Sequence, residues 1–224
     1  MLYLVIRQLF KKAVNTVHAK HEINELVRLL EECYPEPYCA LEYDKDYELL
    51  FSARLAAQCT DARVNTITPI LFDRYPALEQ IADADVSDIE RIIFPCGFYK
   101  TKARDIVAAA HMLRSEFGGR VPDTMEELLR LPGVGRKTAN LMLGDIHKKP
   151  AIVVDTHCIR LSNRIGLVNT KDPVKIETIL RGILPPEKSS DFCHRIVLHG
   201  RAVCKAKKPA CEECCIAELC KRVF

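Results

Sequence analysis

The sequence predicts an all-α protein, and three observations support this. Apolar residues recur every three or four positions through most of the 224 residues, which is the spacing of helices with one buried face. Runs that alternate in the manner of strands are few and short, and the nearest to a strand is the apolar stretch at residues 150–154. Short turns join the helical stretches, as in folds that pack helix on helix.

Five helices are predicted in the first half of the chain. The first covers residues 21–33, with apolar residues along one face and two prolines, Pro35 and Pro37, after its end. The others are expected at residues 47–58, 61–74, 87–94 and 102–117, the second of these five being largely buried. Gly118 and Gly119 follow the last of these helices and are expected to end it, because a residue with a left-handed backbone commonly ends a helix.

The second half continues the helical pattern. Thr124 and Glu127 have the spacing of a capping box, which predicts a helix from there to about residue 130. A turn with two glycines leads into another helix near Arg136, and the apolar run that ends at Asp155 comes after it. Further helices are expected at residues 156–164, at 174–184, and from about residue 191.

The composition is typical of a globular protein and excludes a membrane-spanning one. No apolar run approaches the roughly 20 residues that a membrane helix needs. The net charge of +3 is too small to indicate nucleic-acid binding, so a DNA site would have to be local. Residues 1–20 hold apolar and basic residues and no acidic one, and we interpret them as an N-terminal arm. An organellar targeting segment is the alternative interpretation.

The turn between the two helices near residue 130 is a candidate phosphate site. Glycines allow a very tight turn, whose amides point to one spot together with the free N–H groups of the next helix's first turn. A plain helix-to-helix turn is the alternative, and spacing alone leaves the two level. The candidate DNA-binding residues here are Leu131, Pro132, Gly133, Val134, Gly135, Arg136 and Thr138.

Two ionisable residues near this turn are candidates for catalysis. Lys137 lies in the first turn of the second helix, where the helix dipole and partial burial would favour the neutral amine that nucleophilic attack requires. A solvated lysine that only binds phosphate is the alternative. Asp155 precedes a helix, so it is an expected N-cap, and a capping carboxylate can also stabilise a positive charge or assist a proton transfer.

The eleven cysteines are unevenly placed, and four near the C-terminus have the spacing of a metal site. Cys204, Cys211, Cys214 and Cys220 form the pattern C-x6-C-x2-C-x5-C, which leaves Cys215 over. Disulfides are disfavoured because nothing indicates secretion. The spacing alone does not distinguish structural zinc from an iron–sulfur cluster.

Several of these motifs together resemble the endonuclease III family of helix-hairpin-helix DNA glycosylases. The resemblance is carried by LPGVGRKTAN at residues 131–140 and by VVDTH at residues 153–157. It extends to AAQCTDARVN at 56–65, GFYKTKA at 97–103 and LHGRAVCKAKKPAC at 198–211. The match covers nearly the whole chain from about residue 21.

The resemblance implies a two-lobed fold and a cofactor. One lobe would be a helical barrel at residues 39–149, with the helix-hairpin-helix at about 124–145. The other would combine residues 21–38 with 150–224 and hold a [4Fe–4S] cluster on the four cysteines. The loop between the first two cysteines carries Lys205, Lys207 and Lys208, which we expect to contact DNA phosphates.

The resemblance also implies residue roles and an activity. Lys137 would be the nucleophile and Asp155 its acidic partner in a bifunctional glycosylase and AP lyase. Gln58 matches the residue that fills the gap left by a flipped base, and Asp61 would lie near the recognition pocket. The opposite wedge would be Cys96, Gly97 and Phe98, where the family often has aliphatic residues at the first and last of these positions.

The expected substrate is an oxidised pyrimidine in duplex DNA, handled by a monomer in the cytoplasm, close to the nucleoid. Two rival functions stay open at this point. One is a mismatch-specific glycosylase without lyase action, against which the presence of Lys137 argues. The other is a non-catalytic helix-hairpin-helix protein that binds DNA, or transfers electrons, with an iron–sulfur cluster.

Overall fold

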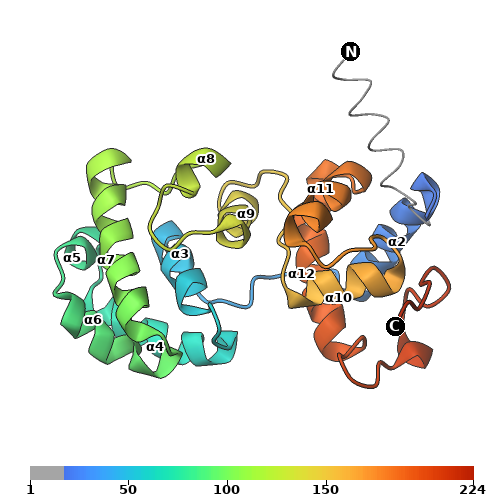
Figure 1. The fold of residues 1–224 in the computed structure, drawn as a ribbon, viewed down its shortest axis with the longest axis horizontal. Helices are drawn as coiled ribbons and strands as arrows, with labels where there is room; N and C mark the ends of the chain where they lie inside the picture. The colour runs from blue at the N-terminus through green and yellow to red at the C-terminus, as the bar shows by residue number, and fades with distance from the viewer. Residues whose placement is uncertain (1–17) are drawn as a thin grey trace, which may run out of the picture. The chain divides into compact units, whose positions relative to one another are not determined.

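The computed structural model describes residues 18–224, and every regular element in this range is a helix (Figure 1). The predicted all-α class is therefore confirmed. The chain divides into two compact units, of which one is continuous, Cys39–Lys149. The other joins the described residues up to Tyr38 to the C-terminal segment Pro150–Phe224.

The continuous unit is built around one buried helix, α3 (Asp46–Leu55), which contacts α4, α7 and α9. Leu49, Leu50, Phe51 and Leu55 on α3 are almost completely buried, as expected for the second helix. The remaining elements of this unit are α4 (Asp61–Arg74), α5 (Leu78–Ala82), α6 (Val86–Ile93), η1 (Phe94–Cys96), α7 (Tyr99–Glu116), α8 (Met125–Leu128) and α9 (Arg136–Asp145).

Several predicted boundaries in this unit need correction. The helix expected at residues 47–58 ends at Leu55, because Gln58 adopts a left-handed backbone with φ 55°. Helix α7 begins at Tyr99, three residues before the predicted start, and the short α5 was not predicted. Gly119 donates its N–H to Leu113 O, which confirms the glycine stop after α7.

The predicted N-cap at the start of the hairpin is present, but Glu127 contacts the Thr124 hydroxyl instead of the Thr124 amide, so the capping box is incomplete. The Thr124 hydroxyl accepts a hydrogen bond from the Glu127 amide at 3.2 Å and donates one to the Glu127 carboxylate at 2.7 Å. Helix α8 ends at Leu128, earlier than the predicted residue 130, so the cap starts a single turn of helix.

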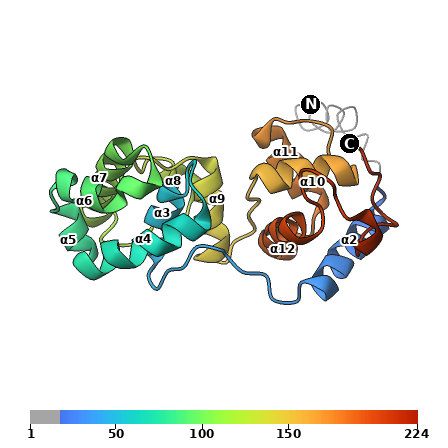
Figure 2. The same ribbon diagram turned by 90° about the horizontal axis from the view of Figure 1, so that it is seen from below.

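The discontinuous unit joins the two ends of the described chain in one core (Figure 2). Leu26 and Leu30 of the first helix are buried in the same cluster as Ile196 and Ile216 from the C-terminal segment. Its elements are α2 (Lys20–Cys33), α10 (Thr156–Ile165), α11 (Pro173–Ile183), η2 (Pro186–Lys188), α12 (Ser189–Ala202) and η3 (Cys211–Glu213).

Two expectations for this unit change. Residues 150–154 have no regular secondary structure and form no strand; Ala151 and Ile152 are buried, and the Ala151 amide donates to the Ser189 hydroxyl. The expected arm at residues 1–20 falls largely on residues 1–17, which lie outside the described residues. His18 is buried and hydrogen-bonds Ile165 O at 3.0 Å, so the discontinuous unit begins by residue 18. Among the described residues, no helix is both long and apolar enough to cross a membrane.

Candidate functional site

The hairpin between α8 and α9 is anchored by buried leucines, and its two glycines are exposed to solvent. Leu128 and Leu131 are buried, and the Val134 amide closes the turn on Leu131 O at 3.1 Å. Gly133 adopts φ 74°, in the left-handed region where a side chain is strained. The turn therefore has the tight geometry that the two glycines predict.

An ion pair supports this turn from the core side. Arg54 Nη2 lies 2.6 Å from Asp105 Oδ2, and both side chains are about one-fifth exposed. A Cβ on Gly133 would lie 2.6 Å from Arg54 Nε and 2.8 Å from Asp105 Oδ2. The glycine is therefore required for close packing as well as for its backbone angle. This support could not be predicted from local sequence patterns, because Arg54 and Asp105 are 51 residues apart.

The first turn of α9 is exposed where an anion could bind. Gly135 is the N-cap with extended backbone, and a Cβ there would meet open space. Gly133, Gly135, Arg136 and Lys137 are exposed, while Thr138 is half-buried. The amides of a helix's first turn have no partner within the helix, so they can bind a phosphate oxygen.

Lys137 differs from the expectation in one respect. Its side chain is exposed, so the predicted partial burial is wrong. The reason is that the buried positions of α9 start at Ala139, and the first turn extends beyond the core. Within the part of the chain that the structure describes, the Lys137 ammonium has no hydrogen bond or ion pair. The amine is therefore accessible from solvent, next to the open amides of the first turn of α9.

Asp155 is the N-cap of α10, as expected. Its Oδ1 accepts a hydrogen bond from the Cys158 amide at 2.7 Å, and the residue is half-buried. The cap holds the side chain in one orientation, because the hydrogen bond fixes Oδ1 on the first turn of the helix. Within the described residues the second oxygen, Oδ2, has no hydrogen bond, so it is available to act on a substrate.

The four predicted metal ligands lie in one small region of the discontinuous unit. Burial raises the pKa of the Cys214 and Cys220 thiols, and the charges of Cys204 and Cys211 add to both shifts, so the four sulfurs are close neighbours. Among the described residues, no group of three or more His, Cys, Asp or Glu side chains is arranged closely enough to hold a metal ion. Four half-buried thiols near one another are a suitable donor set for an iron–sulfur cluster.

Side chains of α10 and α12 hold the loop that carries these cysteines. Arg164 donates to the carbonyls of Lys205 at 2.7 Å and Ala206 at 2.9 Å, and it also contacts the Cys204 sulfur at 3.5 Å. His199 lies 3.4 Å from the Cys214 sulfur through Nε2. Such N–H contacts to sulfur stabilise thiolates and tune a bound cluster.

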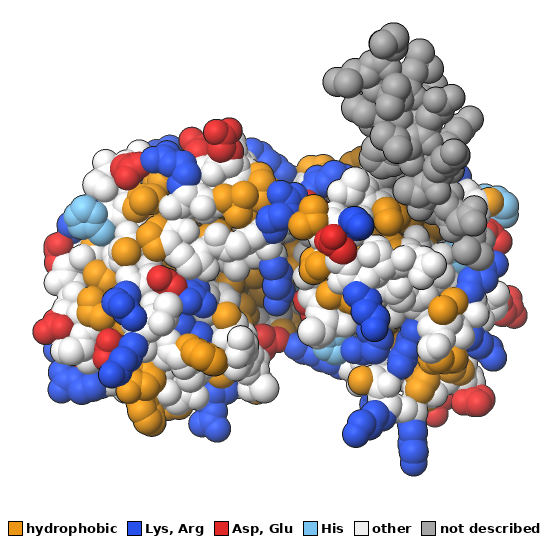
Figure 3. Space-filling view, viewed as in Figure 1, with side chains coloured by type: hydrophobic (Ala, Val, Ile, Leu, Met, Phe, Trp, Pro, Cys, Tyr) orange, Lys and Arg blue, Asp and Glu red, His pale blue; other side chains and the backbone are white. Residues whose placement is uncertain are grey.

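The basic residues of this loop are solvent-exposed. Lys205, Lys207 and Lys208 are all exposed, and Lys208 has a left-handed backbone with φ 54°. Figure 3 shows lysine and arginine side chains projecting from the region after α12. Because Arg164 fixes the loop backbone, these charges can meet phosphates with little ordering on binding.

The predicted gap-filling residue, Gln58, is exposed at the end of α3. Its φ of 55° is unusual for a residue with a side chain, and such strain is often found at functional positions. Asp61 is half-buried at the first position of α4. Thr60 caps this helix by accepting a hydrogen bond from the Arg63 amide at 3.2 Å, so the loop from Gln58 to Asp61 is well defined.

The predicted wedge separates into an exposed residue and a buried one. Phe98 is 66 % exposed with φ 47°, which makes its ring the accessible tip of the loop and rules out a core position. Cys96 is 2 % exposed, so its side chain cannot reach a base. Cys96 is therefore removed from the wedge, since the 3-10 turn directs its thiol into the core.

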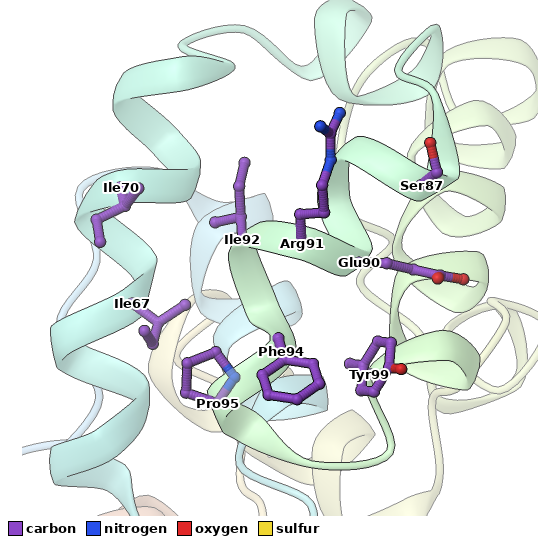
Figure 4. Close-up of a pocket in the computed structure, with 9 residues that line it drawn as sticks. All are labelled: Ile67, Ile70, Ser87, Glu90, Arg91, Ile92, Phe94, Pro95 and Tyr99. Atoms are coloured by element: carbon purple, nitrogen blue, oxygen red, sulfur yellow. The ribbon is translucent and has the colours of Figure 1, made fainter.

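A shallow pocket lies next to this loop, but it contains none of the predicted site residues (Figure 4). Phe94 and Tyr99 lie side by side along it, with ring centroids 4.9 Å apart. The lining residues are Ile67, Ile70, Ser87, Glu90, Arg91, Ile92, Phe94, Pro95 and Tyr99. The two rings are tilted by 52° to each other, and they connect residues before and after Phe98.

Lys102 is a residue of this region for which no role was predicted from the sequence. Lys102 is 1 % exposed and donates to the carbonyls of Leu55 and Cys96, both at 2.8 Å. Lys102 lies on the apolar face of α7 with Ile106 and Leu113. This helical spacing is the signal in the sequence from which its burial could have been predicted. A lysine on a buried helix face requires polar partners in the core.

Comparison with known proteins supports the same family along most of the chain. The family model described as "HhH-GPD superfamily base excision DNA repair protein" matches residues 51–186. A second model, described as "Iron-sulfur binding domain of endonuclease III", matches residues 204–220 and so spans the four cysteines. This second match confirms the predicted [4Fe–4S] cofactor.

Individual relatives agree with this. An endonuclease III of Synechocystis sp. is 45% identical over 202 residues, which cover 90% of this chain and 92% of the relative. The endonuclease III of Escherichia coli is 36% identical over 197 residues, covering 88% of this chain and 93% of that protein.

A solved structure of a trapped covalent endonuclease III–DNA intermediate matches with a TM-score of 0.85 and 37% identity. The match covers 92% of this chain and 97% of that one, and the two-lobed fold class is thereby confirmed. The chain belongs to the endonuclease III family of the HhH-GPD superfamily of base excision DNA repair proteins.

Proposed function

We propose that this protein removes oxidised pyrimidines from duplex DNA and cuts the strand, with Lys137 as the nucleophile of both steps. DNA glycosylase and AP lyase action are the activities of this family. The assignment of Lys137 as the nucleophile rests on its position in the hairpin. Lys137 is exposed in the first turn of α9, directly after the open amides of the glycine turn. A phosphate bound at those amides brings its sugar within reach of the amine.

The chemistry of the lysine follows from its position. Lys137 Nζ attacks C1′ as the bond from C1′ to the base breaks, and the base leaves with the bonding electrons and takes up a proton. Opening of the sugar ring then gives an imine between Nζ and C1′. Loss of a proton from C2′ allows the C3′–O bond to break, and the 3′ phosphate is released. A relative without an amine here could remove a base but could not form the imine.

Asp155 is proposed as the acidic partner of this reaction. Its capped Oδ1 holds the carboxylate in one orientation, and Oδ2 is available to the substrate. A fixed negative charge stabilises the positive charge that develops on the sugar as the base departs, and a carboxylate can also accept the amine proton.

Cys204, Cys211, Cys214 and Cys220 are proposed as the ligands of the [4Fe–4S] cluster. When bound, the cluster supplies cross-links that fix the C-terminal loop. This chain's own contribution is the support of that loop by Arg164 and the exposure of Lys205, Lys207 and Lys208 to DNA phosphates. Duplex DNA is thus the proposed partner of both the hairpin and the basic loop.

Gln58 and Phe98 are proposed to fill the gap that the extruded nucleotide leaves in the stack. Both residues are exposed on strained loops of the continuous unit, as a probe of the base stack must be. Asp61, half-buried beside the first loop, is proposed to contribute to the recognition pocket. We further propose that the protein acts as a monomer in the cytoplasm, at the nucleoid.

A panel of lesion duplexes tests this function. Thymine glycol and dihydrothymine duplexes should give a cut strand ending in the elimination product, whereas Lys137→Gln should give none. A protein that released thymine from a G·T mismatch and left an uncut abasic strand would instead be a mismatch glycosylase. A protein that bound all duplexes and altered none would be a non-catalytic binder.

A further inference from the structure

Two strained loops of the continuous unit are held together by one buried side chain. Gln58 follows α3 with φ 55°, and Phe98 follows η1 with φ 47°. Both residues have side chains, so their left-handed backbone persists only if the surroundings enforce it.

Lys102 supplies a contact to each of these loops. Its Nζ donates to Leu55 O, three residues before Gln58, and to Cys96 O, two residues before Phe98, both at 2.8 Å. Leu55 and Cys96 are the last residues of their helices, where carbonyls lack an intrahelical partner. The two carbonyls are 41 residues apart in the sequence and share one donor.

The surroundings of Lys102 show that this arrangement is specific. The residue is 1 % exposed, and burial lowers the pKa of its amine. An amine buried this deeply is unfavourable unless its N–H groups are hydrogen-bonded, and both protonation states offer enough of them for two carbonyls. Burial also raises the pKa of the nearby Cys96 thiol to about 11, with Cys59 raising it further and Lys102 opposing the rise. Lys102, Cys59 and Cys96 therefore form one compact core beneath the two loops.

We propose that Lys102 is a positioning residue that fixes the Gln58 loop relative to the Phe98 loop. It sets the spacing at which the two side chains enter the base stack. Lys102 touches neither substrate nor reacting atom. Its effect is on extrusion of the damaged nucleotide, which requires both loops at once, and not on the chemistry at Lys137. This inference rests on the proposed function of the two loops.

The test replaces Lys102 by methionine, which has similar length and no donor. Two rates are compared: excision of dihydrothymine from a duplex, and cleavage of a preformed abasic site in a single strand, where no stack has to be filled. We expect the ratio of the two rates to fall about tenfold or more, because small misplacements of positioning groups cost this much. The fluorescence change of 2-aminopurine opposite an abasic analogue should shrink as well, at saturating protein.

The matched control is Leu113→Ala, which opens a cavity on the same helix away from both loops. It should lower stability and leave the ratio at the wild-type value. If Lys102→Met does not fold, Lys102→Gln, which keeps an amide donor, carries the same comparison. An unchanged ratio in the Lys102 variants, an equal fall in Leu113→Ala, or failure of both Lys102 variants to fold would each overturn the proposal. Absence of excision by the wild type would instead refute the proposed function.

Discussion

Gly133 lies directly on the ion pair beneath the hairpin: a Cβ at this position would be 2.6 Å from Arg54 Nε. The turn that we propose to bind DNA is therefore supported by a charged pair in the continuous unit. Close approach and a left-handed backbone both require glycine here, and neither does at Gly135 two residues later.

Substitution of the two hairpin glycines should consequently have different effects. Gly133→Ala should lower the free energy of unfolding by about 2 kcal/mol, because the new methyl group meets Arg54 and a strained backbone. Gly135→Ala should change it by less than about 1 kcal/mol, since its Cβ meets open space. Thermal unfolding of the two variants checks this. Equal destabilisation by both would contradict the described support.

Asp155 allows capping to be separated from catalysis. Asp155→Asn keeps an oxygen that can accept from the Cys158 amide, so stability should change little. Asp155→Ala removes the cap and should lower the free energy of unfolding by about 1 kcal/mol. Both variants lose the charge, so single-turnover excision should fall about a hundredfold in each. Full activity in Asp155→Asn would mean that the residue serves only the helix.

The clustered cysteines include a neighbouring control. Cys211→Ser should abolish the brown colour and most of the bound iron of the purified protein, because one cluster ligand is lost. Cys215→Ser should retain both, since Cys215 is left over from the four-ligand pattern. Iron analysis and the visible absorption spectrum provide the measurement. Iron loss in Cys215→Ser with iron retained in Cys211→Ser would change the ligand assignment.

Removal of the Phe98 ring should affect function far more than stability. The ring is 66 % exposed, so Phe98→Ala should change the free energy of unfolding by about 0.5 kcal/mol or less. Excision from a duplex should fall about tenfold, since a stacking contact with a base is lost. Val174→Ala removes an exposed apolar side chain from the other unit and is the control. Normal excision by Phe98→Ala would remove the residue from the wedge.

The sequence predicted those features that depend on neighbouring residues. The N-caps at Thr124 and Asp155 and the glycine turn are all local patterns, and the structure has each of them. The helix end at Leu55 was placed too late, because two alanines continue the helical pattern and nothing local marks the left-handed Gln58. Local signals therefore locate the elements and leave some of their ends open.

Features that depend on packing between distant segments were not predictable in this way. Lys102 and Leu55 are 47 residues apart, and Arg54 and Asp105 are 51 apart. Burial of Lys137 was predicted wrongly for the same reason, since only the packed structure shows that the core begins two residues later. The cluster ligands could be proposed from the sequence, because the spacing of the thiols along the chain is itself the signal.

The central claim is that Lys137 forms the covalent bond to DNA, and borohydride trapping tests it most directly. Borohydride reduces the imine between lysine and sugar to a stable amine, so the wild type should be cross-linked to a dihydrothymine duplex. Lys100 is the matched control, because it is also an exposed lysine at the second position of a helix. We expect Lys100→Gln to be trapped and Lys137→Gln not to be. A trapped complex with Lys137→Gln would show that another amine is the nucleophile.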